Sequence, residues 1–388
     1  MAEALTADEL TALIERVFQR RRQDRALAFL VDLPDAHVSD QPDWKDRRQL
    51  AQEWASSLRQ ARPQHGLKID LILYRNVGSN NAELPEGGWL HKEGDLPDSA
   101  DQLDPDRQQP LQEFFQTYQI LIALTQFSAT APLKKAAPRF GFRAATMPRF
   151  SRLMIPALRL DYGEVTRRVE MLARLLDRSL EAAIHFEVEG EGAKSLRLDL
   201  RHRKGHASGG LVPQPGTAFN LPSGEAFIVP YEGELQGDPS RSEGVLPVQF
   251  GDEVVLYRIQ HNKAVSVESS GAASQREAAL LQREPAYGNL AELGLGVLSG
   301  MGIEPIGETL LDEKLGLHIA FGRSDHFGGQ VGPSDFGSPQ AVVHIDRIYL
   351  PQIQPRVKVV GAALKTESGE SVEIVRHDRF VFDFGFRS

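Results

Sequence analysis

Histidines and carboxylates inside apolar segments of the C-terminal half are the residues that could do chemistry. The sequence has no cysteine, which excludes disulfides, thiolate nucleophiles and cysteine metal sites. His318 lies in the apolar run Gly316-Leu-His-Ile-Ala-Phe-Gly, and His344 and Asp346 lie in Val342-Val-His-Ile-Asp. Because residues i and i+2 of a strand point to the same side, His344 and Asp346 can bind one metal ion together. The alternative is a hydrogen-bonded core histidine beside an unrelated aspartate.

Two acids lie in similarly apolar surroundings. Glu225 directly follows a Pro-Ser-Gly turn and opens an apolar strand-like run, and Glu292 stands among leucines and glycines. An unpaired buried carboxylate is costly, so each acid needs a cation or a hydrogen-bond donor. A structural salt bridge meets that need, and so does a shared metal ion. These candidate ligands are too numerous for one catalytic zinc ion, but they suit two divalent ions about 3.5–4 Å apart with one bridging carboxylate. The candidates are Glu225, Glu292, His318, His344 and Asp346.

The elements that must position these residues begin with an α/β pattern. Strand-like runs at 26–31 and 68–74 flank a helical pattern at 44–61, which is the order of an α/β layer. The spacing of apolar residues predicts another helix over 111–124. The Asn-, Gly-, Pro- and Asp-rich segment 78–110 predicts a long surface loop.

The composition and hydrophobic pattern of the sequence change at about residue 205. From there on glycine is more frequent, and short strand-like runs replace helical patterns. A chain of 388 residues is also longer than one hydrophobic core usually supports. We therefore predict an α/β N-terminal domain at 1–200 and a mixed, β-rich α+β catalytic domain, which binds the metal, at 201–388.

Composition limits the classes of partner. The net charge is −9 and no domain is strongly basic, which argues against nucleic acid as the main partner. The chain lacks an apolar run of about 18 residues, so no membrane-spanning helix is predicted. The N-terminus lacks the basic start and apolar run of a signal peptide. We expect a soluble, cytoplasmic protein without a membrane partner.

The motifs, taken in order, resemble the aminopeptidase T family, the M29 metallopeptidases. The resemblance covers roughly 115–350 and rests on Asn220-Leu-Pro-Ser-Gly-Glu, Ala291-Glu-Leu-Gly-Leu-Gly, His318-Ile-Ala-Phe-Gly and His344-Ile-Asp. It implies an exopeptidase that acts on a peptide or small amide, an N-terminal α/β domain before a catalytic domain, and a homodimer. It also implies two divalent ions (zinc, cobalt or manganese) bound by Glu225, Glu292, His318, His344 and Asp346.

One segment departs from the pattern of this family. Members often carry a tyrosine seven residues after the strand histidine, whereas this chain has Asp325, followed by His326. A phenol can donate a hydrogen bond to an oxyanion, and an ionised aspartate cannot. We expect His326, as an imidazolium, or Arg323 to take that role, with Asp325 orienting an imidazole, holding the substrate amine or acting as a base. The alternative is a loop without a catalytic role.

Other functions fit part of the pattern. The dihydroxypyridine dioxygenases resemble the same fold, and the alternative function is a mononuclear iron(II) ring-cleaving dioxygenase with a two-histidine, one-carboxylate site. That group has lost the acid after Pro-Ser-Gly and has a histidine where Glu292 stands, so Glu225, Glu292 and His318 favour a hydrolase. A non-catalytic binding module would not need five ligand-type residues, and a serine hydrolase would need a Gly-x-Ser-x-Gly motif. The sequence therefore predicts a metal-dependent aminopeptidase that uses a metal-activated water.

Overall fold

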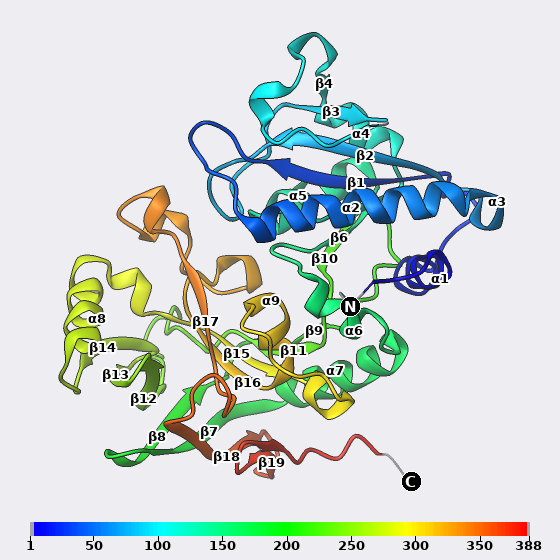
Figure 1. Cartoon of the computed structure of the whole chain (residues 1–388). Coiled ribbons are helices and arrows are strands. Elements are labelled where there is room, and N and C mark those ends of the chain that lie inside the picture. The colour runs from blue at the N-terminus through cyan, green and yellow to red at the C-terminus, as the bar shows by residue number, and fades with distance from the viewer. Residues whose placement is uncertain (1–3, 93, 386–388) are drawn as a thin grey trace. The chain divides into compact units, whose positions relative to one another are not determined.

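The computed structural model describes residues 4–92 and 94–385, which form two compact units (Figure 1). Among the described residues, one unit comprises 4–92, 94–163 and 210–223, and the other comprises 164–209 and 224–385. The boundary predicted near residue 200 differs from this division. Strands β7 (Ser179–Val188) and β8 (Gly192–Asp199) precede residue 200. They nevertheless pair with strands β18 (Val357–Thr366) and β12 (Glu243–Phe250) of the second unit. The fold class is the predicted combination of an α/β unit and a β-rich unit.

The first unit is built on a seven-stranded sheet in the order β10-β6-β5-β1-β2-β3-β4. The five strands from β10 to β2 run parallel, and β3 and β4 complete the sheet in antiparallel fashion. β1 is buried along its whole length, as expected for a parallel strand covered on both faces. The strands are β1 (Ala26–Leu33), β2 (Lys68–Arg75), β3 (Gly87–His91), β4 (Gln109–Pro110), β5 (Ile120–Ala123), β6 (Arg143–Thr146) and β10 (Thr217–Asn220).

Helices flank this sheet, and the longest, α2, packs against β1 and β2 (Figure 1). Its Trp44, Leu50, Trp54 and Leu58 are buried at helical spacing, which explains why the pattern at 44–61 predicted it correctly. The helices of this unit are α1 (Ala7–Phe18), α2 (Pro42–Gln60), α3 (Arg62–His65), α4 (Leu111–Thr117), α5 (Thr130–Phe140) and α6 (Ile155–Leu158).

Two predictions for this unit are wrong in detail. The helix predicted over 111–124 ends at Thr117, and Ile120–Ala123 is the central parallel strand β5. A buried strand and a buried helix can both contain a short run of apolar residues, so the hydrophobic periodicity of 120–124 could not distinguish a strand from a helix. The loop predicted over 78–110 contains the strands β3 and β4 and two short 3-10 turns, Ala100–Gln102 and Pro105–Arg107.

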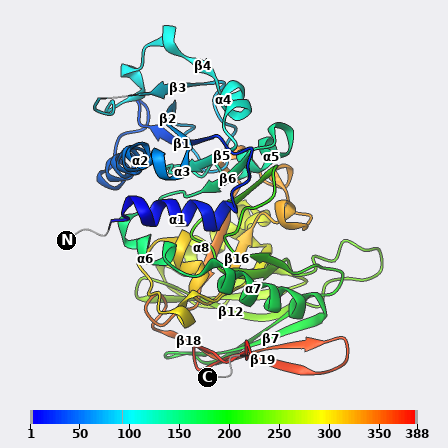
Figure 2. The same cartoon turned by 90° about the vertical axis from the view of Figure 1, so that its right-hand side faces the viewer.

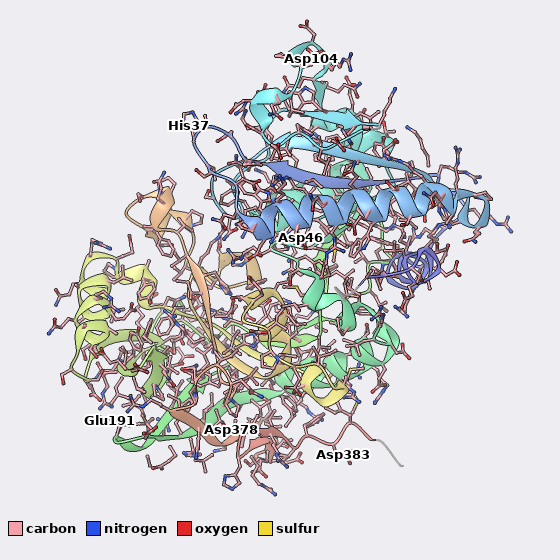
Figure 3. All side chains as sticks on the ribbon, in the orientation of Figure 1. His37, Asp46, Asp104, Glu191, Asp378 and Asp383 are labelled. Carbon is pink, nitrogen blue, oxygen red and sulfur yellow. The ribbon has the colours of Figure 1, made fainter. Side chains whose placement is uncertain are left out.

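The second unit contains an eight-stranded antiparallel sheet in the order β14-β13-β12-β8-β7-β18-β19-β20. Figure 2 shows the β18–β19 hairpin beside β7, and Figure 3 labels Glu191 in the turn between β7 and β8. Besides β7 and β8, its strands are β12 (Glu243–Phe250), β13 (Glu253–Gln260), β14 (Lys263–Val267), β18 (Val357–Thr366), β19 (Ser371–Arg376) and β20 (Arg379–Phe380).

A five-stranded antiparallel sheet, in the order β17-β16-β15-β11-β9, packs on the larger sheet. The rings of Phe321 on β16 and Tyr257 on β13 lie 5.1 Å apart, so the face of β16 that carries Leu317, Ile319 and Phe321 faces the larger sheet. The opposite face carries His318. The strands are β9 (His206–Ser208), β11 (Glu225–Ile228), β15 (Leu290–Gly296), β16 (Leu317–Gly322) and β17 (His344–Ile348).

The second unit also contains helices, of which α7 (Tyr162–Asp177) buries Val165, Val169, Leu172 and Leu176. None of the helices in the described ranges is both long and apolar enough to cross a membrane. The α-helices are α7 (Tyr162–Asp177), α8 (Ala272–Arg283) and α9 (Thr309–Asp312). Two 3-10 turns bear on the site described next, η6 (Glu313–Leu315) and η7 (Asp325–Phe327).

Candidate metal centre

Strand register brings the five predicted ligands onto one face of the five-stranded sheet. Gly296 lies opposite Glu225, Gly294 opposite His318, and Ala320 opposite Asp346. Residues directly opposite in adjacent strands share a face, and residues i and i+2 share a face along a strand. The face therefore gathers Glu225, Glu292, His318, His344 and Asp346.

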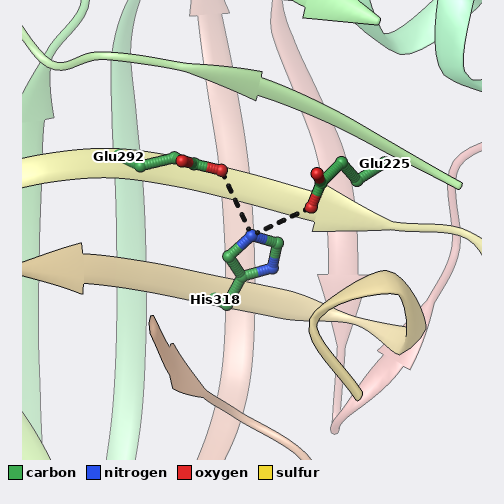
Figure 4. A group of neighbouring side chains, drawn as sticks. All are labelled: Glu225, Glu292 and His318. Carbon is green, nitrogen blue, oxygen red and sulfur yellow. Dashed lines mark hydrogen bonds and ion pairs between the residues drawn. The ribbon is translucent and has the colours of Figure 1, made fainter. Parts of the chain in front are cut away.

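Three of these residues form a fully buried group, which we call the inner group: Glu225, Glu292 and His318. His318 Nε2 lies 3.4 Å from Glu225 Oε2 and 3.4 Å from Glu292 Oε1, so the imidazole nitrogen points between two carboxylates (Figure 4). Within the described part of the chain, Glu225 Oε2 is buried without a hydrogen bond. A buried carboxylate oxygen that faces only an imidazole at 3.4 Å, beside a second carboxylate, is in an environment that a cation would complete.

The other three-residue combination, the edge group, consists of Glu292, His344 and Asp346. His344 Nε2 lies 3.3 Å from Glu292 Oε2 and 3.6 Å from Asp346 Oδ1. The edge group lies partly on β17, the outermost strand of the sheet, and the His344 side chain is 20% exposed. Glu292 thus belongs to both groups and directs one oxygen toward each histidine.

Backbone carbonyls orient both rings. His318 Nδ1 lies 3.2 Å from Gly316 O, and His344 Nδ1 lies 2.8 Å from Arg323 O. A ring nitrogen beside a carbonyl must carry the proton, so Nδ1–H donates to it and Nε2 turns toward the carboxylates. This arrangement is typical of histidines that bind metal through Nε2.

The electrostatics are consistent with such a centre. Burial disfavours an imidazolium, but Glu225 and Glu292 outweigh burial and raise the pKa of His318 well above 6.5. Burial likewise opposes a charge on His344, and Asp346 and Glu292 raise its pKa well above 6.5. The two histidines in turn outweigh burial and lower the pKa of Glu292 to about 2. Protons on the two rings therefore balance the acids without a metal, and divalent cations could replace them.

Two glycines of β15 make room for the inner group. A Cβ atom on Gly294 would lie 1.9 Å from His318 Nε2, and a Cβ atom on Gly296 would lie 2.2 Å from the carbonyl carbon of Lys314. Neither contact is sterically possible, so the imidazole can lie over β15, and η6 can approach it, only because both positions are glycine. The Glu-x-Gly-x-Gly alternation is thus a packing feature of the site.

Two ionisable residues of η6 lie beside the inner group. Neither was predicted from the sequence. Lys314 is 1% exposed, and its Nζ donates to Glu225 Oε1 at 2.5 Å and also to Glu313 Oε1. Burial opposes the ammonium, but Glu225 and Glu313 outweigh it and raise the pKa of Lys314. The Glu313 side chain is 12% exposed; desolvation raises its pKa, and it contacts Asp346. The sequence Asp-Glu-Lys has the character of a solvated turn, so its spacing gave no signal of burial.

The segment after β16 lies beside the edge group. Arg323 Nε donates to Asp325 Oδ1 at 2.5 Å, and His326 Nδ1 lies 3.6 Å from the same oxygen, so the aspartate contacts both a guanidinium and an imidazole. The His326 ring lies 5.3 Å from the His344 ring. Burial, together with His344 and Arg323, lowers the pKa of His326 to about 4. His326 is therefore a neutral imidazole near pH 7, which differs from the predicted imidazolium.

A buried glutamate, Glu232, fixes this segment. Its carboxylate accepts hydrogen bonds from Ser324 Oγ at 2.6 Å and from the backbone N–H of Gln330 at 2.5 Å. It also accepts from Asn289 Nδ2 at 2.8 Å, which ties the segment to the residue before β15. The position of His326 next to His344 is thus set by the fold rather than by a free loop.

Comparison with known proteins shows what the fold resembles. No protein-family model matches the chain, and no curated protein sequence matches it. Among solved structures, 2,5-dihydroxypyridine dioxygenase from Pseudomonas putida KT2440 is similar over 97% of this chain and 98% of its own, with a TM-score of 0.59 and 14% identity. Wild-type AmpT from Thermus thermophilus is similar over the same shares, with a TM-score of 0.51 and 15% identity. The chain therefore shares a fold with both proteins.

Proposed function

We propose that this chain is a divergent member of the aminopeptidase T family, a metal-dependent hydrolase that removes N-terminal residues from peptides or small amides. One observation carries the proposal. Glu292 directs Oε1 toward His318 and Oε2 toward His344, at 3.4 and 3.3 Å. A carboxylate shared by two ligand groups is the arrangement that a two-metal centre needs.

The proposed ligands divide between two ions. Glu225, Glu292 and His318 would hold one, and Glu292, His344 and Asp346 would hold the other. When bound, two divalent ions of zinc, cobalt or manganese supply a nucleophilic hydroxide near neutral pH and polarise the substrate carbonyl. Gly316 O and Arg323 O keep both histidine Nε2 atoms available for this role.

The segment after β16 supplies the proposed catalytic residues. His326, as a neutral imidazole, can donate a ring N–H to an oxyanion that develops beside the edge group. Arg323 and Asp325 form an ion pair, so Asp325 acts here by holding Arg323 rather than as a free base. Arg323 also provides the carbonyl that orients His344.

A mononuclear iron(II) ring-cleaving dioxygenase is the second candidate, because the dioxygenase from P. putida shares the fold. Such a site takes two histidines and one carboxylate on a single ion. Here each candidate group contains one histidine and two carboxylates. This donor set favours a hydrolase.

The test compares both activities in one preparation. Protein loaded with Zn²⁺, Mn²⁺ or Co²⁺ should hydrolyse aminoacyl amides, and protein loaded with Fe²⁺ should not open 2,5-dihydroxypyridine with O₂. Glu292→Gln should lose metal at both positions together with turnover. Glu284→Gln, which alters another buried acid, should retain both. Ring opening without amide hydrolysis would reverse the assignment.

The homodimer is proposed with this function. Light scattering of the purified protein at several concentrations should give the mass of two chains. A monomer at every concentration would remove the dimer without affecting the metal centre.

A further inference from the structure

The ammonium group of Lys314 is embedded among the carboxylates of the candidate centre. Its Nζ donates to Glu225 Oε1 and to Glu313 Oε1, and the Lys314 side chain is 2% exposed. An ion pair this deeply buried carries a large desolvation penalty, which only close and well-placed partners offset. A charge held at this depth therefore calls for an explanation.

We infer that Lys314 is a fixed cation that makes the two metal positions unequal, so that one divalent ion binds tightly at the edge group and the second binds weakly at the inner group. The inference rests on the proposed metal centre. Lys314 would then set the relative affinities of the two metal positions. The inner position would fill only at higher metal concentration, after the edge position.

Glu225 shows how the inequality arises. One of its oxygens, Oε1, is occupied by Lys314 Nζ at 2.5 Å, and only Oε2 faces His318. The carboxylate can therefore give the inner ion one oxygen, and part of its charge is already neutralised. An ion at the inner group would also lie close to the ammonium, and two like charges in a buried site repel each other strongly.

The edge group lacks such competition. Glu292 Oε2 and Asp346 Oδ1 face His344 Nε2 at 3.3 and 3.6 Å, and neither carboxylate is ion-paired with a lysine or arginine within the described ranges. Glu313 contacts Asp346 but is itself held by Lys314. The edge ion therefore meets two carboxylates and one imidazole, and no lysine or arginine in the described ranges is paired with either carboxylate.

The experiment is a titration of metal-free wild-type protein with Mn²⁺, in which free Mn²⁺ is followed by its electron paramagnetic resonance signal. Two classes of site should appear, the second at least about tenfold weaker than the first. Asp346→Asn should remove the tight class and Glu225→Gln the weak one. Two sites of equal affinity in the wild type would overturn the inference, whereas no binding at all would overturn the proposed function instead.

Variants of Lys314 separate an electrostatic role from a purely structural one. Lys314→Met, of similar length but uncharged, should tighten the weak class by about tenfold or more, because the repelling charge is gone and Glu313 is released. Lys358→Met removes an exposed lysine of β18 and should change neither class. A folded Lys314→Met protein with the wild-type ratio of affinities would refute the inference. If the Lys314→Met variant does not fold, the titration of the wild-type protein still tests whether the two metal positions differ in affinity.

Discussion

Gly294 lies directly opposite His318 across β15 and β16, and the imidazole occupies the space that a side chain at 294 would fill. The strand that carries the shared ligand Glu292 therefore also supplies the empty surface on which a second ligand rests. The inner group therefore depends on the lack of a side chain at Gly294 as much as on its carboxylates.

Gly294→Ala should consequently disturb the inner group selectively. The added methyl would lie 1.9 Å from His318 Nε2, so the ring must move. Overpacking of this kind costs about 1–3 kcal/mol in the free energy of unfolding, and the inner ion should be lost. Thermal unfolding and metal titration check both effects. Gly361→Ala is the control, since its nearest contact would be at 3.9 Å. Unchanged metal binding in Gly294→Ala would contradict the role given to His318.

The stability of the metal-free protein should fall as the pH rises above 6.5. His318 and His344 have raised pKa values in the folded protein because of the surrounding carboxylates, after burial is overcome. A raised pKa gives stability that is complete below the unfolded-state value, near 6.5, and is lost as the pH rises through the folded-state value.

Metal loading should reverse this dependence, because neutral imidazoles bind the ions and affinity rises with pH as protons leave. The measurement is the melting temperature of the metal-free and the metal-loaded protein, taken from pH 6 upward in steps of about half a pH unit. A metal-free protein whose melting temperature stays constant or increases across this range would argue against protonated rings in the cluster.

His326→Ala should lower kcat by about 10²–10³ while leaving metal content intact, as expected for the loss of one oxyanion donor. Because the His326 ring is neutral near pH 7, this contribution should persist above the pH range in which an imidazolium would be lost. His377→Ala, in the exposed turn after β19, serves as the matched control. Normal turnover in His326→Ala would show that the residue has no catalytic part.

Local sequence indicated which side chains come together better than it indicated what surrounds them. His344-x-Asp346 on a strand and Glu225 after a glycine turn follow from strand periodicity, which the structure retains. Lys314 and Glu313 could not be predicted, because Lys314 contacts Glu225 on a strand distant in the sequence, and Glu313 joins the group through Lys314. The domain division was equally inaccessible, since β7 and β8 join the second unit through long-range pairing with β18 and β12.

The number and identity of bound ions test the two-metal centre most directly. Equilibrium dialysis against saturating Mn²⁺ or Zn²⁺, followed by elemental analysis, should give about two ions per chain, and Glu292→Gln should give almost none. The same analysis of protein purified without added metal should not find iron as the single bound ion. One iron per chain, or a Glu292→Gln variant that binds metal like the wild type, would contradict a centre built around a shared carboxylate.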